Sequence, residues 1–598
     1  MKVSAWSMAV LAVIFTLGLA ELAHSLYRMQ VVDVAEFKQN LAQQATRRMR
    51  KPGIRGRIID ARGGVLAESR ARRDIVCDLS NFFEGGGISN TVAAIDREIA
   101  RLAGALGRER PESSRPERIA RHIRAMSAVP FCVWKDLDDE TLARFEERAT
   151  TFPGFSVEAH AERIYPRGTF AAHLIGYTGR DRGGNDTDDS RMLAYELEMK
   201  GRTGLEAFYN DYLAGVPGAV RITVDARGFK PQGAARENIS LGETEEREAQ
   251  DGLDLEITID PAVQEAAEKQ LEGVRGAVVA LDPRDGAVIA LASAPTYNPN
   301  DFVPFLSAKR YRELSDDPDH PLLNRATAGL YAPGSTFKPV TAIAALANGI
   351  NPAEQYECSG AYKLGDMRLH CWNRWGQGML TMREAIEQSC NPYFARLGYL
   401  IGTNSLFKVA REFGFEAKTG IDYSPEYAGS LTSPPFYPGL ACQSAIGQGR
   451  LQVTPLQMAV ECAALANGGK VFAPYLKKRA ADAPPPEPVR TLKCRAEDIE
   501  LVRLGMRDVI EGAKGTGKAI GGLAVSCAGK TGTAQIGGGE KDTWIIAFAP
   551  YEQPTVAIAM VVERGDSGGK TVAPKVHAIL ASIFGEQNGA ATQSGEAR

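Results

Sequence analysis

The chain has 598 residues, of which 44% are hydrophobic, 24% charged and 8% aromatic. These ordinary values exclude wholesale disorder and a multi-span membrane protein, and the length allows about four domains. Lys and Arg total 70 against 73 Asp and Glu, so the net charge of −3 argues against a protein built mainly to bind nucleic acid.

Residues 3–20 form an uncharged, apolar run at the amino terminus. At about 1.5 Å per residue, a helix of this length would nearly cross a hydrocarbon core of about 30 Å. Lys2 precedes the run, so the positive-inside rule predicts a cytoplasmic start and an exported remainder. A cleaved signal peptide, cut after Ala20, is the alternative. The apolar positions Leu22, Leu26 and Met29 favour a helix that emerges from the membrane.

The next 230 or so residues mix strand-like and helix-like patterns. Residues 55–67 read as two strands joined by a Gly-Gly turn, and residues 90–150 have helical periodicity with many charges. Residues 225–252 are polar and irregular, which indicates a loop or hinge. The last dozen residues are small and polar, so we expect a flexible tail.

From about residue 253 the pattern indicates one antiparallel sheet that is covered by helices. Residues 282–286 (Asp-Pro-Arg-Asp-Gly) join two apolar runs and are typical of a hairpin turn. Helical patterns dominate the roughly 230 residues between an early and a late group of strands, which predicts an α+β fold. The predicted strands cover residues 255–259, 277–281, 287–291, 525–535, 543–549 and 555–562.

Nine cysteines are present, but none forms a CxxC pair. Cys358, His370 and Cys371 could in principle ligate zinc, with Cys390 further along the chain, although their spacing matches no standard zinc finger. A Cys358–Cys371 disulfide and plain packing are the alternatives. We therefore predict no metal site, with these three residues as weak candidates only.

The first motif that indicates chemistry is Ser335-Thr-Phe-Lys338. An apolar helical run follows it and Gly349 stops that run, so Ser335 is expected to open a helix. Free N–H groups and the helix dipole would stabilise a developing negative charge there. Lys338 lies one turn along, so it could act as the base for Ser335 if burial removes its proton.

Two further motifs follow in the same predicted domain. Ser389-Cys-Asn391 ends a helical run and offers a hydroxyl and an amide, whereas Lys530-Thr-Gly-Thr533 lies in a predicted strand. In the strand, Lys530 and two hydroxyls could hold a carboxylate, and Gly532 leaves room for a peptide against the strand edge. The order SxxK, SxN, KTG is the set found in active-site serine enzymes that react with penicillin.

With these motifs the sequence resembles the class B penicillin-binding proteins, over nearly the whole chain. Residues 55–67, 163–168, 201–206, 323–329, 446–449 and 454–458 also look like motifs of that class. The resemblance implies an anchor at residues 1–23, an elongated, mostly β pedestal at 24–252, a transpeptidase domain at 253–585 and a tail at 586–598. The transpeptidase domain would have the penicillin-binding, serine β-lactamase-like fold, with a five-stranded antiparallel sheet flanked by helices.

Carried over motif by motif, the resemblance implies cross-linking of peptidoglycan stem peptides that end in D-Ala-D-Ala. Ser335 would attack the peptide, Lys338 would take its proton, Ser389 would relay a proton, and Asn391 would position the donor. Lys530, Thr531 and Thr533 would hold the terminal carboxylate beside Gly532. No cofactor is required, and β-lactams would acylate the same serine.

The expected partners are a membrane glycosyltransferase and other wall-assembly proteins, because residues 30–250 contain no glycosyl-transfer motif. The expected location is the cytoplasmic membrane, with the catalytic domain in the periplasm. Residues 370–378 resemble the elongation branch more than the division branch, although that branch usually has His where Gln377 stands. A β-lactamase, a β-lactam sensor and a non-catalytic scaffold are the less favoured alternatives.

Overall fold

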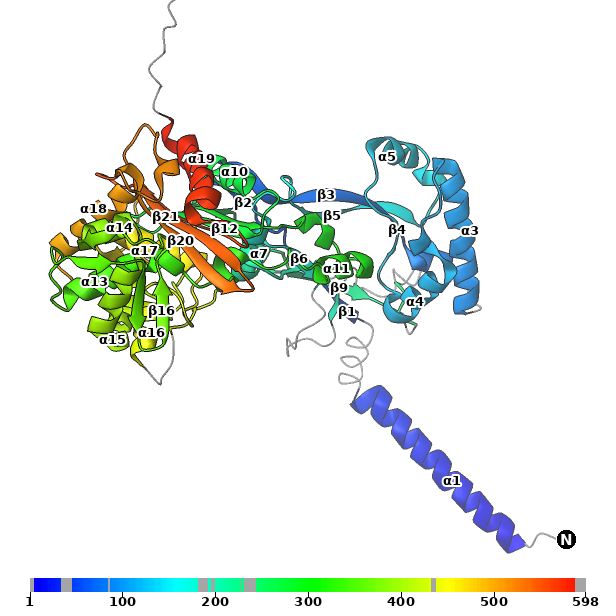
Figure 1. Ribbon diagram of the computed structural model, residues 1–598. Helices are drawn as coiled ribbons and strands as arrows, with labels where there is room; N and C mark the ends of the chain where they lie inside the picture. The colour runs from blue at the N-terminus through cyan, green and yellow to red at the C-terminus, as the bar shows by residue number, and fades with distance from the viewer. Residues whose placement is uncertain are drawn as a thin grey trace, which may run out of the picture.

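The computed structural model describes residues 5–33, 46–83, 87–180, 192–194, 199–225, 227–230, 244–431 and 437–586. Figure 1 shows a single helix, an elongated middle part and a larger rounded part. We call described residues 46–252 the pedestal, which the sequence predicts at 24–252, and residues 253–585 the C-terminal domain. Of the predicted tail, residues 586–598, the structure describes residue 586 alone.

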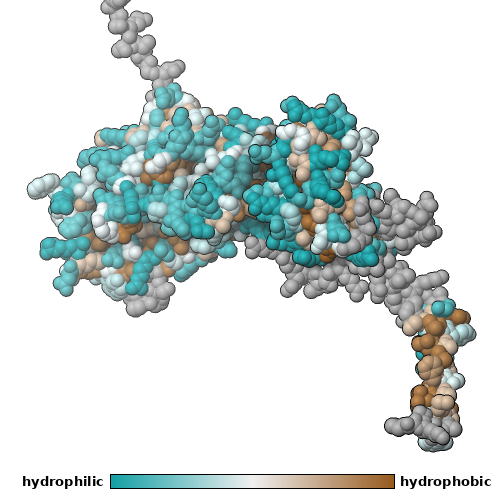
Figure 2. All heavy atoms as spheres, turned by 90° about the vertical axis from the view of Figure 1, so that its right-hand side faces the viewer, coloured by the Kyte–Doolittle hydropathy of each residue, from teal (hydrophilic) through white to brown (hydrophobic). Residues whose placement is uncertain are grey.

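The amino-terminal helix α1 (Ala5–Tyr27) continues as a π-helical turn, η1 (Arg28–Val32). Within the described residues, Trp6–Val32 is the one helix long and apolar enough to span a membrane, and none of it is buried against other parts. Figure 2 shows apolar side chains around this helix, in contrast to the largely hydrophilic surface elsewhere. The helix extends beyond residue 20, as the apolar positions after it predicted.

Long strands form the shaft of the pedestal. Strand β3 (Val65–Cys77) pairs antiparallel with β5 (Phe155–Ile164), from Glu68 opposite Ile164 to Cys77 opposite Phe155. At the far end in Figure 1, β4 (Phe131–Trp134) packs with three helices, α3 (Ile88–Leu106), α4 (Pro116–Met126) and α5 (Asp139–Glu146). The helical pattern at residues 90–150 is therefore confirmed, and the pedestal is mixed, with β strands along the shaft and helices at its end.

A second pedestal sheet has the order β10-β9-β1-β7. Its strands are β1 (Thr46–Lys51), β7 (Met192–Ala194), β9 (Gly218–Thr223) and β10 (Thr244–Arg247). The smaller pedestal elements are β6 (Thr178–Arg180), β8 (Met199–Gly201), α6 (Ala172–Ile175), α7 (Gly204–Phe208) and α8 (Asn210–Ala214). Part of the segment 225–252, predicted as a loop, thus adds an edge strand to this sheet.

The chain passes from the pedestal to the C-terminal domain through β11 (Leu255–Glu256). This strand pairs in parallel with β2 (Ile58–Ile59), which in turn pairs with β3, so it belongs to the pedestal's sheet. The alternating pattern at residues 255–259 predicted a strand but could not show its partner. The pairing ties the start of the C-terminal domain to the shaft.

Three pedestal motifs meet at one buried carboxylate. Glu206 Oε2 accepts a hydrogen bond from Arg55 Nε and Glu206 Oε1 accepts one from Arg163 Nε, both at 2.6 Å. Arg163 also donates to the backbone oxygen of Gly56 at 2.7 Å. Removing one member of such a buried ion group leaves uncompensated charge, so it is costly even where the intact group contributes little net stability.

We expect Glu206→Gln to destabilise the pedestal by about 3–5 kcal/mol, because Arg55 and Arg163 would keep their charges without a carboxylate. Chemical denaturation followed by circular dichroism measures the loss. Glu497→Gln, which neutralises a side chain that is 84% exposed, is the matched control and should change stability little. Equal effects of the two substitutions would contradict the importance of the buried group.

The C-terminal domain is built on a five-stranded antiparallel sheet of order β13-β12-β22-β21-β20. Its strands are β12 (Gly276–Leu281), β13 (Val288–Ala294), β20 (Ala528–Gly537), β21 (Glu540–Ala549) and β22 (Val556–Val562). The predicted hairpin joins β12 to β13, and β22 pairs with β12, so both ends of the domain close one sheet. This confirms the predicted α+β fold.

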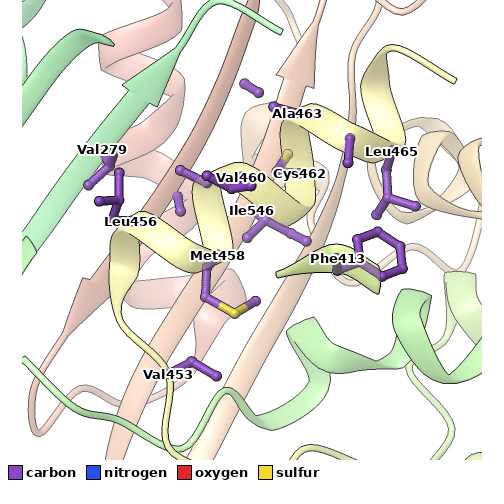
Figure 3. Packing of buried hydrophobic residues seen from close by; sticks show 14 of the residues in the cluster. Val279, Phe413, Val453, Leu456, Met458, Val460, Cys462, Ala463, Leu465 and Ile546 are labelled. Atoms are coloured by element: carbon purple, nitrogen blue, oxygen red, sulfur yellow. The ribbon is translucent and has the colours of Figure 1, made fainter. Parts of the chain in front are cut away.

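Helices cover both faces of this sheet, and each face has its own apolar core. One face carries α13 (Lys338–Ala347), α14 (Met382–Glu387), α15 (Asn391–Phe413), α17 (Pro455–Ala466) and α18 (Ala496–Glu511). The other carries α10 (Pro261–Gln270) and α19 (Ala573–Phe584). In Figure 3, α17 lies across the sheet with Leu456 near Val279 and with Met458 toward Val453.

The smaller elements of the domain surround these helices. They are α11 (Ala308–Ser315), α12 (Arg325–Ala328), α16 (Pro438–Ser444), β14 (Tyr356–Cys358), β15 (Ala361–Leu364), β16 (Met367–His370), β17 (Gly378–Leu380), β18 (Lys470–Val471) and β19 (Arg490–Thr491). Strands β14–β17 form two small sheets beside α15.

One carboxyl group in α17 is buried without a partner. Glu461 has no exposed surface, and neither of its side-chain oxygens makes a hydrogen bond within the described part of the chain. Burial raises the pKa of Glu461 well above its usual 4.5, because the charged form loses its hydration. The group is therefore held in its protonated form.

This burial predicts a pH-dependent loss of stability. Below about pH 4.5 the carboxyl is neutral in both states, whereas above it the unfolded chain ionises and the folded protein resists ionisation. We expect Glu461→Gln to raise the Tm at pH 8 and to change it little near pH 4.5, as measured by differential scanning fluorimetry. An identical Tm shift at both pH values would contradict the raised pKa.

Candidate active site

Ser335 lies in a 3-10 turn, η6 (Gly334–Phe337), that leads directly into α13. The sequence predicted a helix that begins at Ser335. In the structure the regular helix begins three residues later, at Lys338. Gly334 needs its positive φ of +57° and donates its N–H to the oxygen of Gly447 at 2.8 Å. The turn is thus fixed against the Ile446–Gly449 segment, and Ser335 remains partly exposed at its surface.

Lys338 points into the protein and has no exposed surface. Its Nζ lies 2.7 Å from the backbone oxygen of Ser389, 3.3 Å from Ser389 Oγ and 2.8 Å from Asn391 Oδ1. The ring of Phe394 lies 5.5 Å away from this nitrogen. The first two motifs, 54 residues apart in the sequence, therefore meet around one amine.

Ser389 follows α14, whose first turn is fixed by a capping box between Thr381 and Glu384. Ser389 itself adopts a positive φ of +56°, a conformation that few side chains adopt without support from their surroundings. Lys530, in β20, donates to Ser389 Oγ at 2.8 Å and to the oxygen of Thr531 at 2.9 Å. One hydroxyl thus lies between two lysine nitrogens.

The electrostatics of the two lysines follow from this burial. Loss of hydration lowers the pKa of Lys338 from 10.5 to about 8, and burial together with the charge of Lys338 lowers the pKa of Lys530 well below 10.5. Two neighbouring ammonium groups repel each other, so the pair favours a state in which one amine is neutral. A neutral amine beside a serine is a base, and Ser389 can pass a proton between the two nitrogens.

Close packing of the chain around Gly532 leaves no room for a side chain at this position. A Cβ at this position would lie 2.9 Å from Thr336 Cγ2, 3.0 Å from Trp544 Cβ and 3.1 Å from the oxygen of Pro333. The absent side chain therefore lets the turn that carries Ser335 approach β20. Close approach of this turn brings Ser335 to the strand of the third motif.

The loop between β16 and β17 supports the second motif. Asn391 donates through Nδ2 to the backbone oxygen of His370 at 2.9 Å. Gln377 donates to the oxygen of Gln388 at 3.0 Å, and Trp372 donates to the same oxygen at 2.8 Å. Gln377, where the related branch usually has His, thus holds the residue that precedes Ser389.

The structure changes the set of weak metal candidates. Cys358, Cys371 and Cys390 are buried, and their sulfur atoms lie within 4.8 Å of one another, whereas His370 is exposed and contributes its backbone oxygen to Asn391. All nine cysteines have free thiols, so the alternative Cys358–Cys371 disulfide is wrong. The sequence named Cys390 only as a more distant residue and not among the three weak candidates, because Cys390 joins the cluster through a tertiary contact.

The thiols of this cluster are not equivalent. A hydrogen bond from Cys390, backbone N–H groups and the charge of Lys338 outweigh burial and lower the pKa of Cys371 to about 5. The same hydrogen bond raises the pKa of Cys390 above its usual range. Cys371 Sγ also lies 3.3 Å from Gln377 Oε1. The three thiols pack this loop against the segment of the second motif.

Taken together, the site unites a partly exposed serine, two buried lysines, a bridging hydroxyl, an amide and two strand threonines. The backbone N–H groups of Ser335 and Thr533 are the candidates for an oxyanion hole, because the turn that carries Ser335 lies close to Thr533. Gly334 and Thr533 approach closely enough that a Cβ at position 334 would lie 2.9 Å from the oxygen of Thr533. The chemistry that this equipment supports is acyl transfer through a serine ester.

Comparison with known proteins agrees with this chemistry. Residues 276–581 match the penicillin-binding protein transpeptidase domain, and residues 50–256 match the penicillin-binding protein dimerisation domain. The chain is 31% identical to the peptidoglycan D,D-transpeptidase MrdA of Acinetobacter baumannii, over 90% of this chain and 82% of that protein.

Two solved structures are similar over most of the chain. One is the complex between a penicillin-binding protein, PBP2, and MreC from Helicobacter pylori, with a TM-score of 0.76 and 25% identity, covering 90% of this chain and 98% of that one. The other is a peptidoglycan synthase complex that coordinates polymerization and crosslinking, with a TM-score of 0.71 and 28% identity, covering 98% of this chain and 99% of that one.

Proposed function

This chain belongs to the class B penicillin-binding proteins and is a peptidoglycan D,D-transpeptidase of the elongation type, and we propose that Ser335 is its nucleophile. The observation that carries the assignment is the position of the Ser389 hydroxyl, which lies within hydrogen-bonding distance of both Lys338 and Lys530. This arrangement supplies the base and the proton path that a serine needs for attack on a peptide bond.

In the first half of the reaction, the neutral amine of Lys338 takes the proton of Ser335 as Oγ attacks the penultimate D-Ala carbonyl carbon. The N–H groups of Ser335 and Thr533 stabilise the resulting oxyanion. Collapse of the tetrahedral intermediate breaks the C–N bond, and Ser389 passes a proton from the lysine pair to the leaving D-Ala amine. An ester between Ser335 and the donor peptide remains.

In the second half, an amine of a neighbouring stem peptide attacks this ester and gives up its proton through the same groups. The new amide bond cross-links the two strands, and Ser335 recovers its hydroxyl. Water in place of the amine would give a D,D-carboxypeptidase side activity. All bonds formed and broken are accounted for by groups of this chain and its two substrates, so the scheme needs no cofactor.

The donor's terminal carboxylate is recognised by Lys530, Thr531 and Thr533, while Asn391 positions the donor backbone. Side chains alternate between the two faces of β20, so Thr531 and Thr533 are neighbours on one face. Lys530 lies on the other face, beside Ser389. This arrangement supports the proposed roles of the two threonine hydroxyls as donors. β-Lactams mimic the donor, so they acylate Ser335 and block the site.

We infer that wall-assembly proteins are the partners, because one similar structure is a complex with MreC and another is a peptidoglycan synthase complex. We infer that a membrane glycosyltransferase makes the glycan strands and that α1 keeps this chain in the same membrane. The catalytic domain then lies on the periplasmic side, where the positive-inside rule and the location of peptidoglycan both require it.

Covalent labelling tests the nucleophile. We expect a fluorescent penicillin to label the full-length protein, and we expect Ser335→Ala to abolish the label because no ester can form. Ser526→Ala removes a hydroxyl that bonds Glu552 away from the site, and this control should keep the label. An unlabelled wild-type protein would sink the proposed function, and a labelled Ser335→Ala variant would move the nucleophile elsewhere.

The rate of acylation should depend on pH through Lys338. Because its pKa is lowered to about 8, the neutral fraction grows as the pH rises toward that value. We therefore expect the second-order rate of penicillin acylation to rise about tenfold per pH unit below pH 7 and to level off above about pH 8. Stopped-flow measurement with a pH-stable penicillin checks this limb, and a rate constant that stays flat across the range would rule out Lys338 as the base.

A further inference from the structure

A loop that none of the three motifs includes contacts the strand of the third motif. Residues 512–517 connect α18 to a 3-10 turn, η7 (Lys518–Ile520). Within this loop, Thr516 Oγ1 lies 2.7 Å from Thr531 Oγ1, so the two hydroxyl groups share a hydrogen bond. Thr531 is 7% exposed, so few other groups can compete for its hydroxyl.

The loop is held on several sides, which gives Thr516 a defined position. Gly517 donates to the oxygen of Val509 at 2.8 Å, and the N–H of Lys514 donates to Glu387 Oε1 at 2.8 Å. Glu387 is the last residue of α14, the helix that leads to Ser389. On another side, a Cβ at Gly569 would lie 2.6 Å from the oxygen of Thr516, so the chain packs closely there.

The direction of the shared hydrogen bond decides what Thr531 can offer a substrate. A hydroxyl has one proton, and a carboxylate only accepts hydrogen bonds. If Thr531 gave its proton to Thr516, it would present only lone pairs to the donor's carboxylate, which would repel it. If Thr516 donates, the proton of Thr531 is free to point at the carboxylate, and the donation strengthens it.

We propose that Thr516 is a positioning residue that donates to Thr531 and thereby directs the Thr531 proton toward the terminal carboxylate of the donor peptide or β-lactam. The proposal rests on the proposed function and deepens it, because it assigns recognition of a free carboxylate to a pair of hydroxyls. Thr516 acts on binding, so it affects the affinity for carboxylate-bearing ligands rather than the chemical step at Ser335.

The test compares Thr516→Val and Thr516→Ser in the full-length protein. The concentration dependence of acylation by a fluorescent penicillin separates the apparent dissociation constant from the rate at saturation. Val has nearly the shape of Thr but no proton, so we expect a roughly 3- to 10-fold weaker apparent affinity, the range for loss of one hydrogen bond. The rate at saturation should stay within about twofold, and Ser should restore the affinity.

Two controls separate positioning from a structural effect. Thr258→Val removes a hydroxyl that donates to the oxygen of Val288 at 2.7 Å in another part of the domain, and it should leave the affinity unchanged. A penicillin methyl ester lacks the carboxylate, so wild type and Thr516→Val should react with it equally.

The possible results test the role of Thr516 separately from the proposed function. An affinity of Thr516→Val equal to wild type, a loss confined to the saturated rate, an equal loss with the ester, or a failure of Ser to restore binding would each overturn the role of Thr516. Absence of labelling in the wild-type protein would overturn the proposed function itself.

Discussion

The C-terminal domain depends on the burial of two lysines around one hydroxyl. Among the hydrogen bonds of the described residues, neither Lys338 Nζ nor Lys530 Nζ reaches a carboxylate, and each is satisfied by neutral oxygens. Burying two uncompensated charges would be prohibitive, so the arrangement is stable only if a proton is easily given up. Burial destabilises the charged forms of the two lysines, which is a cost in folding. It also favours a neutral amine, which can act as a base.

The fold meets this cost by bringing three separate elements into close contact. The turn before α13 lies against β20 because Gly532 has no side chain, and against residue 447 because Gly334 and Gly447 both adopt positive φ angles. A larger residue at Gly334 or Gly532 would push the turn that carries Ser335 away from β20 by steric contact alone. The backbone thus positions the serine, and the antiparallel sheet gives the rigid edge on which it is positioned.

The pedestal is stabilised by a different kind of buried charge. There Glu206 compensates Arg163, 43 positions before it, and Arg55, 151 positions before it. Parallel pairing of β11 with β2 then continues the shaft into the C-terminal domain. Figure 1 shows the result, an elongated support that extends from the C-terminal domain to the helices α3, α4 and α5. Such a support suits an enzyme that must reach a polymer while it remains attached to a membrane.

The sequence by itself determined the apolar helix, the antiparallel sheet covered by helices and the residues of the three motifs, because these depend on local periodicity and on short motifs. The tertiary structure alone decided that β11 pairs with the pedestal, that Gly532 serves a close contact, that Cys390 replaces His370 in the thiol cluster, and that Thr516 meets Thr531. Each of these is a contact between segments distant in the chain. No periodicity within one segment records which other segment will pack against it, since that is set by the shape of the whole fold.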